Sequence, residues 1–79
     1  MDGKFDANQV AVLVKQHFEK IGNIFLFRIE KINYNTEKSI WIVECSFFDA
    51  LFSNKRIFYR VEIDSKDGKF ISENKIEET

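Results

Sequence analysis

The sequence predicts a two-layer α+β domain in which one N-terminal helix packs on a three- to four-stranded antiparallel meander sheet, in the order α-β-β-β-β. Three observations lead to this fold class. Apolar residues recur with helical spacing near the N-terminus, and apolar and polar residues alternate along later segments as they do in strands. The connections between these segments are short, which favours neighbouring antiparallel strands with the helix across one apolar face.

The helix is expected at about residues 7–21. Its apolar face has the spacing i, i+3, i+4, i+7, i+8 and i+11, formed by Val10, Leu13, Val14, His17, Phe18 and Ile21. Asp6 and Gln9 have the spacing of a capping box at the helix start. Gly22 follows the last apolar residue and can take the left-handed conformation that commonly ends a helix.

Four strands are expected at about residues 24–34, 39–48, 55–64 and 69–73. In the first strand the apolar residues change phase, which predicts a β-bulge near Glu30 and Lys31. Asp67 and Gly68 predict a short hairpin loop in which Gly68 has a positive φ. The charged residues 74–79 are expected to form a frayed tail.

Length and composition indicate one domain, residues 1–79. The formal net charge is −1 and gives no global attraction to nucleic acid or anionic membranes. The one cysteine excludes an intrachain disulfide, which suits a reducing compartment. No secretory signal is recognised, and no apolar run approaches the roughly 20 residues that span a bilayer. The cytoplasm is therefore the expected location.

The order of elements and three short segments resemble a PepSY-type domain. The segments are Trp41-Ile42-Val43, Tyr59-Arg60-Val61-Glu62-Ile63-Asp64 and Asp67-Gly68-Lys69. The resemblance covers about residues 7–71 and implies a helix followed by strand hairpins. Domains of this type often lie outside the cytoplasm or on a membrane tether, with proposed roles in non-catalytic regulation or binding. This chain shows neither a signal nor an anchor, so the topology alone is carried over.

The residue types that usually form reactive sites have structural explanations here. His17 lies with the apolar residues of the helix and has no second histidine or paired cysteine to complete a metal site, so we expect a half-buried ring over apolar neighbours. Cys45 falls on the expected core face, as a small buried hydrophobe. Residues 64–68 fail the EF-hand pattern because Lys66 stands at its third position, so a turn is expected. No catalytic constellation, cofactor site or metal site is predicted.

Apolar residues outside the expected core predict an interaction surface. They are Ile40, Ile42, Phe48, Leu51, Phe52 and Phe58. Because a monomer rarely exposes a large contiguous apolar patch, the open sheet face and the loop at residues 49–54 are expected to bind a partner protein or a second copy in a homodimer. In the competing interpretation, Leu51 and Phe52 fold over the edge of the core and the remaining residues are exposed singly.

Basic residues near Phe58 give the alternative function, a nucleic-acid-binding sheet. The cations are Arg28, Lys55, Arg56 and Arg60. Proteins that bind single strands combine such charges with aromatic stacking platforms. Carboxylates are expected on the same sheet face, at Glu30, Glu44 and Glu62. They favour cross-strand ion pairing, so a non-catalytic protein-binding module is preferred to nucleic-acid binding.

Overall fold

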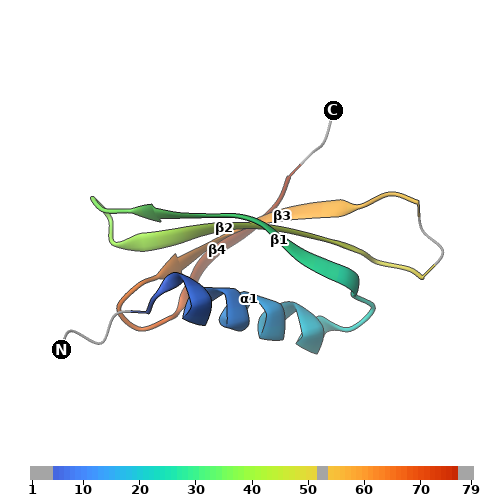
Figure 1. Ribbon diagram of the computed structural model, residues 1–79, viewed down its shortest axis with the longest axis horizontal. Helices are drawn as coiled ribbons and strands as arrows, with labels where there is room; N and C mark the ends of the chain where they lie inside the picture. The colour runs from blue at the N-terminus through green and yellow to red at the C-terminus, as the bar shows by residue number, and fades with distance from the viewer. Residues whose placement is uncertain (1–4, 52–53, 77–79) are drawn as a thin grey trace.

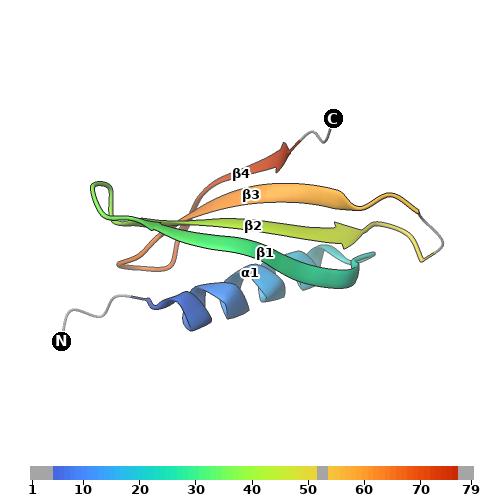
Figure 2. The same ribbon diagram turned by 45° about the horizontal axis from the view of Figure 1, so that its top comes forward.

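A computed structural model describes residues 5–51 and 54–76 and shows the expected α+β fold. One helix is followed by four strands: α1 (Ala7–Ile21), β1 (Phe25–Asn35), β2 (Ile40–Phe48), β3 (Ile57–Asp64) and β4 (Phe70–Ile76). The strands form one antiparallel sheet in the order β1-β2-β3-β4. The helix lies along one face of this sheet (Figures 1 and 2). In the described ranges, no helix is long and apolar enough to cross a membrane.

Local side-chain chemistry begins α1 as expected. The Asp6 carboxylate accepts a hydrogen bond from the Gln9 main-chain amide at 2.8 Å, and the Gln9 side chain accepts one from the Asp6 amide at 2.8 Å. This reciprocal pair is the predicted capping box. At the other end, Gly22 has a φ of 84° but a ψ of 169°, so the chain leaves α1 in an extended direction and the expected left-handed cap does not form.

The edge strand β1 is interrupted twice. Its register against β2 shifts between Ile29 and Lys31, which confirms the bulge predicted there. A second shift lies between Phe25 and Arg28 and was not predicted from the sequence. Leu26 stands inside it with a φ of 54°, in the left-handed region that large side chains rarely adopt.

The last strand continues further than its charged sequence suggested. We expected pairing to end near Glu73, but β4 continues to Ile76, so the expectation of a tail beginning at residue 74 was wrong. Ile76 lies opposite Phe58 of β3. This apolar cross-strand pair stabilises the ladder beyond the polar residues before it.

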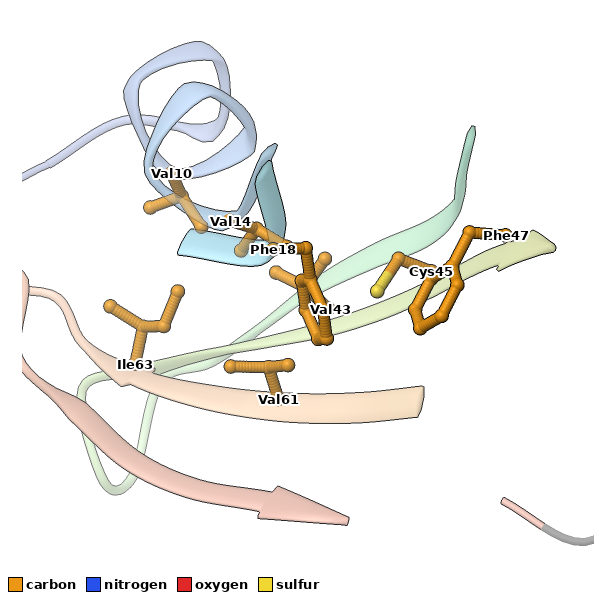
Figure 3. Close-up of a cluster of buried hydrophobic side chains, with 8 residues drawn as sticks. All are labelled: Val10, Val14, Phe18, Val43, Cys45, Phe47, Val61 and Ile63. Carbon is orange, nitrogen blue, oxygen red and sulfur yellow. The ribbon is translucent and has the colours of Figure 1, made fainter. Parts of the chain in front are cut away.

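The core lies between α1 and the two central strands, as Figure 3 shows. Its buried members are Val10, Val14, Phe18, Val43, Cys45, Phe47, Val61 and Ile63. They come from the helical face and from alternate positions of β2 and β3 that the sequence pattern had identified. Burying each large apolar side chain contributes about 1.5–3 kcal/mol, so these residues account for much of the driving force for folding.

Phe5 fastens the chain to the sheet just before α1 begins. Its amide donates to the carbonyl of Ser65 at 2.8 Å, and its carbonyl accepts from the indole Nε1 of Trp41 at 2.9 Å. Gly68 has the predicted positive φ, at 73°, and a Cβ added there would stand 2.9 Å from the Phe5 ring. Glycine at this position therefore satisfies both the turn and the close approach of Phe5.

Candidate functional site

The sheet face away from α1, called the open face below, is set by the strand register. Even-numbered positions of β2 and β3 face away from the buried odd-numbered ones because successive side chains alternate. The main residues of this face are Ile42, Glu44, Ser46, Phe48, Phe58, Arg60 and Glu62. In the described part of the chain, the single helix lies on the opposite side, so no secondary-structure element covers the open face (Figure 2).

A polar network crosses the open face from β1 to the start of β3. Ser46 is fully buried, and its hydroxyl donates to the Glu30 carboxylate. The same carboxylate accepts from Arg28 Nε at 2.7 Å. The hydrogen bond from Ser46 and then that from Arg28 lower the pKa of Glu30, so this carboxylate stays ionised at neutral pH. The segment around the predicted bulge in β1 thus contributes an anion that is bonded to β2.

Arg56 connects three strands at one end of this network. Its NH1 group donates to the Leu26 carbonyl at 3.0 Å and to the Ser46 hydroxyl at 2.9 Å. Its guanidinium carbon lies 4.6 Å from the centre of the Phe48 ring, a cation–π distance. Arg56, just before β3, therefore covers Phe48 and reaches across β2 to the left-handed segment of β1.

Two large apolar side chains are exposed near this end. Leu26 is 73% exposed and Leu51, in the connection after β2, is 68% exposed. Both adjoin the residues at which β1 begins and β2 ends. We call Leu26, Phe48, Leu51 and Arg56 together the Leu26 end.

The predicted interaction residues do not all lie together. Phe48 and Phe58 are half-buried on the open face, and Ile42 lies further along it. Ile40 is only 8% exposed and begins β2, about 26 Å from Phe48 at the usual rise of a strand. The structure thus separates Ile40 from the Leu26 end, while the predicted contact residue Phe52 lies outside the described residues.

Of the predicted basic residues, Arg28, Arg56 and Arg60 each contact side chains of the open face. Arg60 NH2 lies 3.1 Å from Glu44, its direct cross-strand neighbour, as the ion-pairing interpretation expected. Arg28 pairs with Glu30, Arg56 contacts Phe48 and Ser46, and Lys55 is exposed in the segment before β3.

His17 has a partner that the sequence analysis missed. Its ring stacks on Phe70 with 4.4 Å between centroids and meets Phe18 edge-on, as expected for a half-buried ring over apolar neighbours. Its Nε2 also lies 2.7 Å from Glu73 Oε1. Strict alternation would place Phe70 and Glu73 on opposite faces, but a register shift around Ile71 brings both to the helix side.

Cys45 and the β3–β4 turn have the structural roles expected for them. Cys45 is fully buried, and burial is the main cause that raises the pKa of its thiol to about 12. The carboxylates of Asp64 and Asp67 accept hydrogen bonds from the amides of Lys66 and Lys69 at 2.8 and 3.0 Å. In the described ranges, no group of three or more histidine, cysteine or acidic side chains is arranged to hold a metal ion.

A hollow of about 440 Å³ opens on the helix side of the sheet, where α1 ends. Nothing in the sequence pattern predicted it. Its walls are formed by Phe18, Ile21, Gly22, Asn23, Ile24, Phe47, Asp49, Ile57, Tyr59, Glu73 and Lys75. Apolar and aromatic groups thus form its floor, with three charged side chains among its lining residues.

Comparison of the chain with known protein families, curated proteins and solved structures finds no match. The resemblance of residues 7–71 to PepSY-type domains therefore stays a prediction.

Proposed function

We propose that this protein is a non-catalytic interaction module whose Leu26 end and adjoining open face bind an apolar, acidic segment of a partner protein. The observation that supports this proposal most directly concerns Leu26. Its side chain is exposed, its backbone is left-handed, and its carbonyl accepts a hydrogen bond from Arg56. Strained conformations of large residues are concentrated at functional sites, because elsewhere an unstrained alternative is available.

The apolar part of the surface supports a protein partner. Leu26 and Leu51 are exposed, and Phe48 and Phe58 lie half-buried beside them on the open face. Interfaces commonly bury a few such side chains at their centre and surround them with polar groups. The bonds from Arg56 to Leu26 and Ser46 hold this end of the surface before a partner arrives.

The charges of the network beside the Leu26 end favour an acidic segment. Arg28 and Arg56 lie together with the single carboxylate of Glu30, which leaves an excess positive charge in the network. Complementary charge chiefly increases the association rate and excludes the wrong partners. A partner carboxylate approaching Arg56 would meet a guanidinium that already covers an aromatic ring.

Nucleic acid is the alternative occupant, and the ion pairs count against it. Arg28 and Arg60 each contact a carboxylate on the same face, so phosphates would have to compete for them. Phe48 lies under Arg56, which leaves less of its ring for stacking with a base. A second copy of the chain is a further possible occupant, which would make the module a homodimer.

The family resemblance and the expected location agree with such a module, and both are part of the proposal. The PepSY-type resemblance implies non-catalytic binding. The buried free thiol of Cys45 supports a reducing compartment, so we propose the cytoplasm as the location.

The proposal is tested with two short probe peptides that share leucine and phenylalanine and carry either glutamate or lysine between them. Amide chemical shifts of the labelled protein are followed by NMR during each titration, at low and high salt. We expect the glutamate peptide to shift the amides around Leu26, Leu51 and Arg56, and high salt to weaken its binding. Equal binding of the lysine peptide would contradict the charge argument.

Leu26→Asn combined with Leu51→Ser removes the two exposed side chains while leaving the core intact. Asparagine tolerates a positive φ better than leucine, so the fold should persist. We expect at least a tenfold loss of affinity for the glutamate peptide, about 1.4 kcal/mol. Val12→Gln is the matched control, since Val12 is 53% exposed on α1, away from the open face.

Two further measurements separate the other occupants. Salt-dependent shifts with a single-stranded oligonucleotide, in the absence of shifts with the peptide, would replace the proposal with the nucleic-acid alternative. A solution mass that doubles over a concentration series in wild type and not in the double variant would identify a second copy as the occupant, against the proposed acidic segment.

A further inference from the structure

The hollow at the end of α1 exists because the helix is shorter than the sheet it covers. A helix of 15 residues is about 22 Å long, whereas β2, with 9 residues, spans about 30 Å. Beyond Gly22 the chain turns back into β1, and the sheet runs past the C-terminal end of α1 (Figure 1). The helix-side face of the sheet is therefore incompletely covered there. The hollow that results has a volume of about 440 Å³, which falls in the range of small-molecule sites.

The floor of the hollow is an aromatic cluster anchored in the core. Phe18 and Phe47 are 1% and 5% exposed, so they are held firmly from behind. Tyr59 is half-buried and stacks on Phe47 with 5.7 Å between centroids, and it meets Phe18 at 5.4 Å. Ile24 and Ile57 add apolar walls on either side. Phe18 and Phe47 hold the Tyr59 ring in place, so a flat apolar group can pack against this ring as aromatic rings do.

The electrostatic setting of the hollow is negative. The C-terminal end of a helix carries partial negative charge on carbonyls that lack intrahelical partners. Gly22 has a φ of 84° and a ψ of 169°, so the chain extends away from the helix end and no left-handed cap closes over these carbonyls. Lys20, in that last turn, is not among the residues that line the hollow.

Side chains in the lining add to this bias. Asp49 is exposed there, and Glu73 lies across from it with Oε1 bound to His17. Lys75 is the opposing cation. Asp49 and the helix end are therefore the groups that favour a cation here, while Glu73 is already bound to His17 and Lys75 is the opposing ammonium group.

From this geometry we propose that the hollow binds a small arylalkylamine, a molecule that joins a flat aromatic ring to a protonated amine. The ring lies against Tyr59 and Ile57, where burial of apolar surface favours it. The amine lies toward Asp49 and the carbonyls at the end of α1, where a positive charge is stabilised. This site is on the helix side of the sheet, whereas the proposed protein-binding surface is on the open face.

Three probes that share the indole ring test the ligand class: tryptamine, 3-methylindole and indole-3-acetate, which are cationic, neutral and anionic. Each is titrated into the full chain while methyl and amide shifts are followed by NMR. We expect tryptamine to bind most tightly and indole-3-acetate most weakly, with shifts at Ile24, Ile57 and Asn23. Shifts confined to other residues, or an anion that binds as tightly as the amine, would overturn the inference.

Two variants that change the charge of the hollow in opposite directions test the electrostatic part of the proposal. Asp49→Asn should weaken tryptamine binding and Lys75→Gln should strengthen it, each by about two- to fivefold, as for exposed charge pairs. Both residues are exposed, so the fold should be unaffected. Lys66→Gln is the matched control, because Lys66 is exposed in the β3–β4 turn and does not line the hollow.

A fourth variant tests the aromatic floor. Tyr59→Leu keeps an apolar side chain but removes the ring, and we expect it to weaken the binding of tryptamine and 3-methylindole. Thermal unfolding of the same sample verifies that the variant is folded. Unchanged tryptamine affinity in a folded Tyr59→Leu protein, or in both charge variants, would refute the proposed binding mode.

Discussion

Replacing Cys45 with alanine should alter how the stability of the protein depends on pH. In the folded state, burial raises the pKa of this thiol from the ordinary 9.0 to about 12. In the unfolded chain the thiol is exposed to water and ionises at its ordinary pKa. Between about pH 9 and pH 12 the unfolded state therefore binds fewer protons than the folded state, and the free energy of unfolding falls as the pH rises.

The size of the effect follows from the two pKa values. At pH 8 the contribution is negligible, because the thiol is protonated in both states. At pH 10, one unit above the ordinary value of 9.0, ionisation of the unfolded thiol lowers the stability by about 1.4 kcal/mol. Cys45→Ala lacks this effect but keeps every other titrating group, so those groups cancel in the comparison.

The assay is urea unfolding of wild type and Cys45→Ala at pH 7, 8, 9 and 10, with Trp41 fluorescence as the probe. Alanine removes buried volume, so wild type should be the more stable protein at pH 7. That stability difference should shrink by about 1.4 kcal/mol on going to pH 10. A difference that stays constant across the series would refute the burial argument for Cys45.

Three further substitutions test the packing and the turns. Phe18→Ala should cost about 3–5 kcal/mol, because Phe18 is fully enclosed in the aromatic core, and chemical denaturation measures this loss. A cost below 1 kcal/mol would show that this core is not tightly packed. Gly68→Ala should lower the melting temperature by several degrees, since its φ is 73° and a Cβ would stand 2.9 Å from the Phe5 ring. An unchanged melting temperature would contradict that contact. Asp6→Ala should cost about 1 kcal/mol through loss of the capping box, measured by urea unfolding, and an equal cost for Asp6→Asn would show that the negative charge of Asp6 is what matters.

Features that depend on consecutive residues could be predicted from the sequence. The capping box needs only Asp6 and Gln9, three positions apart, and the positive φ of Gly68 follows from the turn chemistry around it. The buried faces of β2 and β3 follow from alternation. The bulge near Glu30 was visible because the apolar pattern itself changes phase there.

Features that depend on register or on distant contacts were not accessible in this way. The bulge around Ile71 leaves no phase change in so short a segment, yet it alone brings Glu73 to His17. The bond from Arg56 to Leu26 joins residues 30 positions apart. The hollow results from the length of α1 relative to the sheet, which no local pattern records.

The double attachment of Phe5 has a consequence for the order in which the molecule assembles. The meander brings sequence neighbours together, and hairpins of this kind form on the order of microseconds. Docking of α1 brings together Phe5 and Trp41, which are 36 residues apart, and closing a loop of this length costs conformational entropy. Contacts with the sheet offset this cost, so we expect the helix to dock after the sheet has formed. Phe5 is also bonded to Ser65 beside the β3–β4 turn, so departure of α1 breaks a contact of that turn as well. Phe5 thus connects α1, the element expected to dock last, to the β3–β4 hairpin, which is the hairpin furthest from α1 in the sequence.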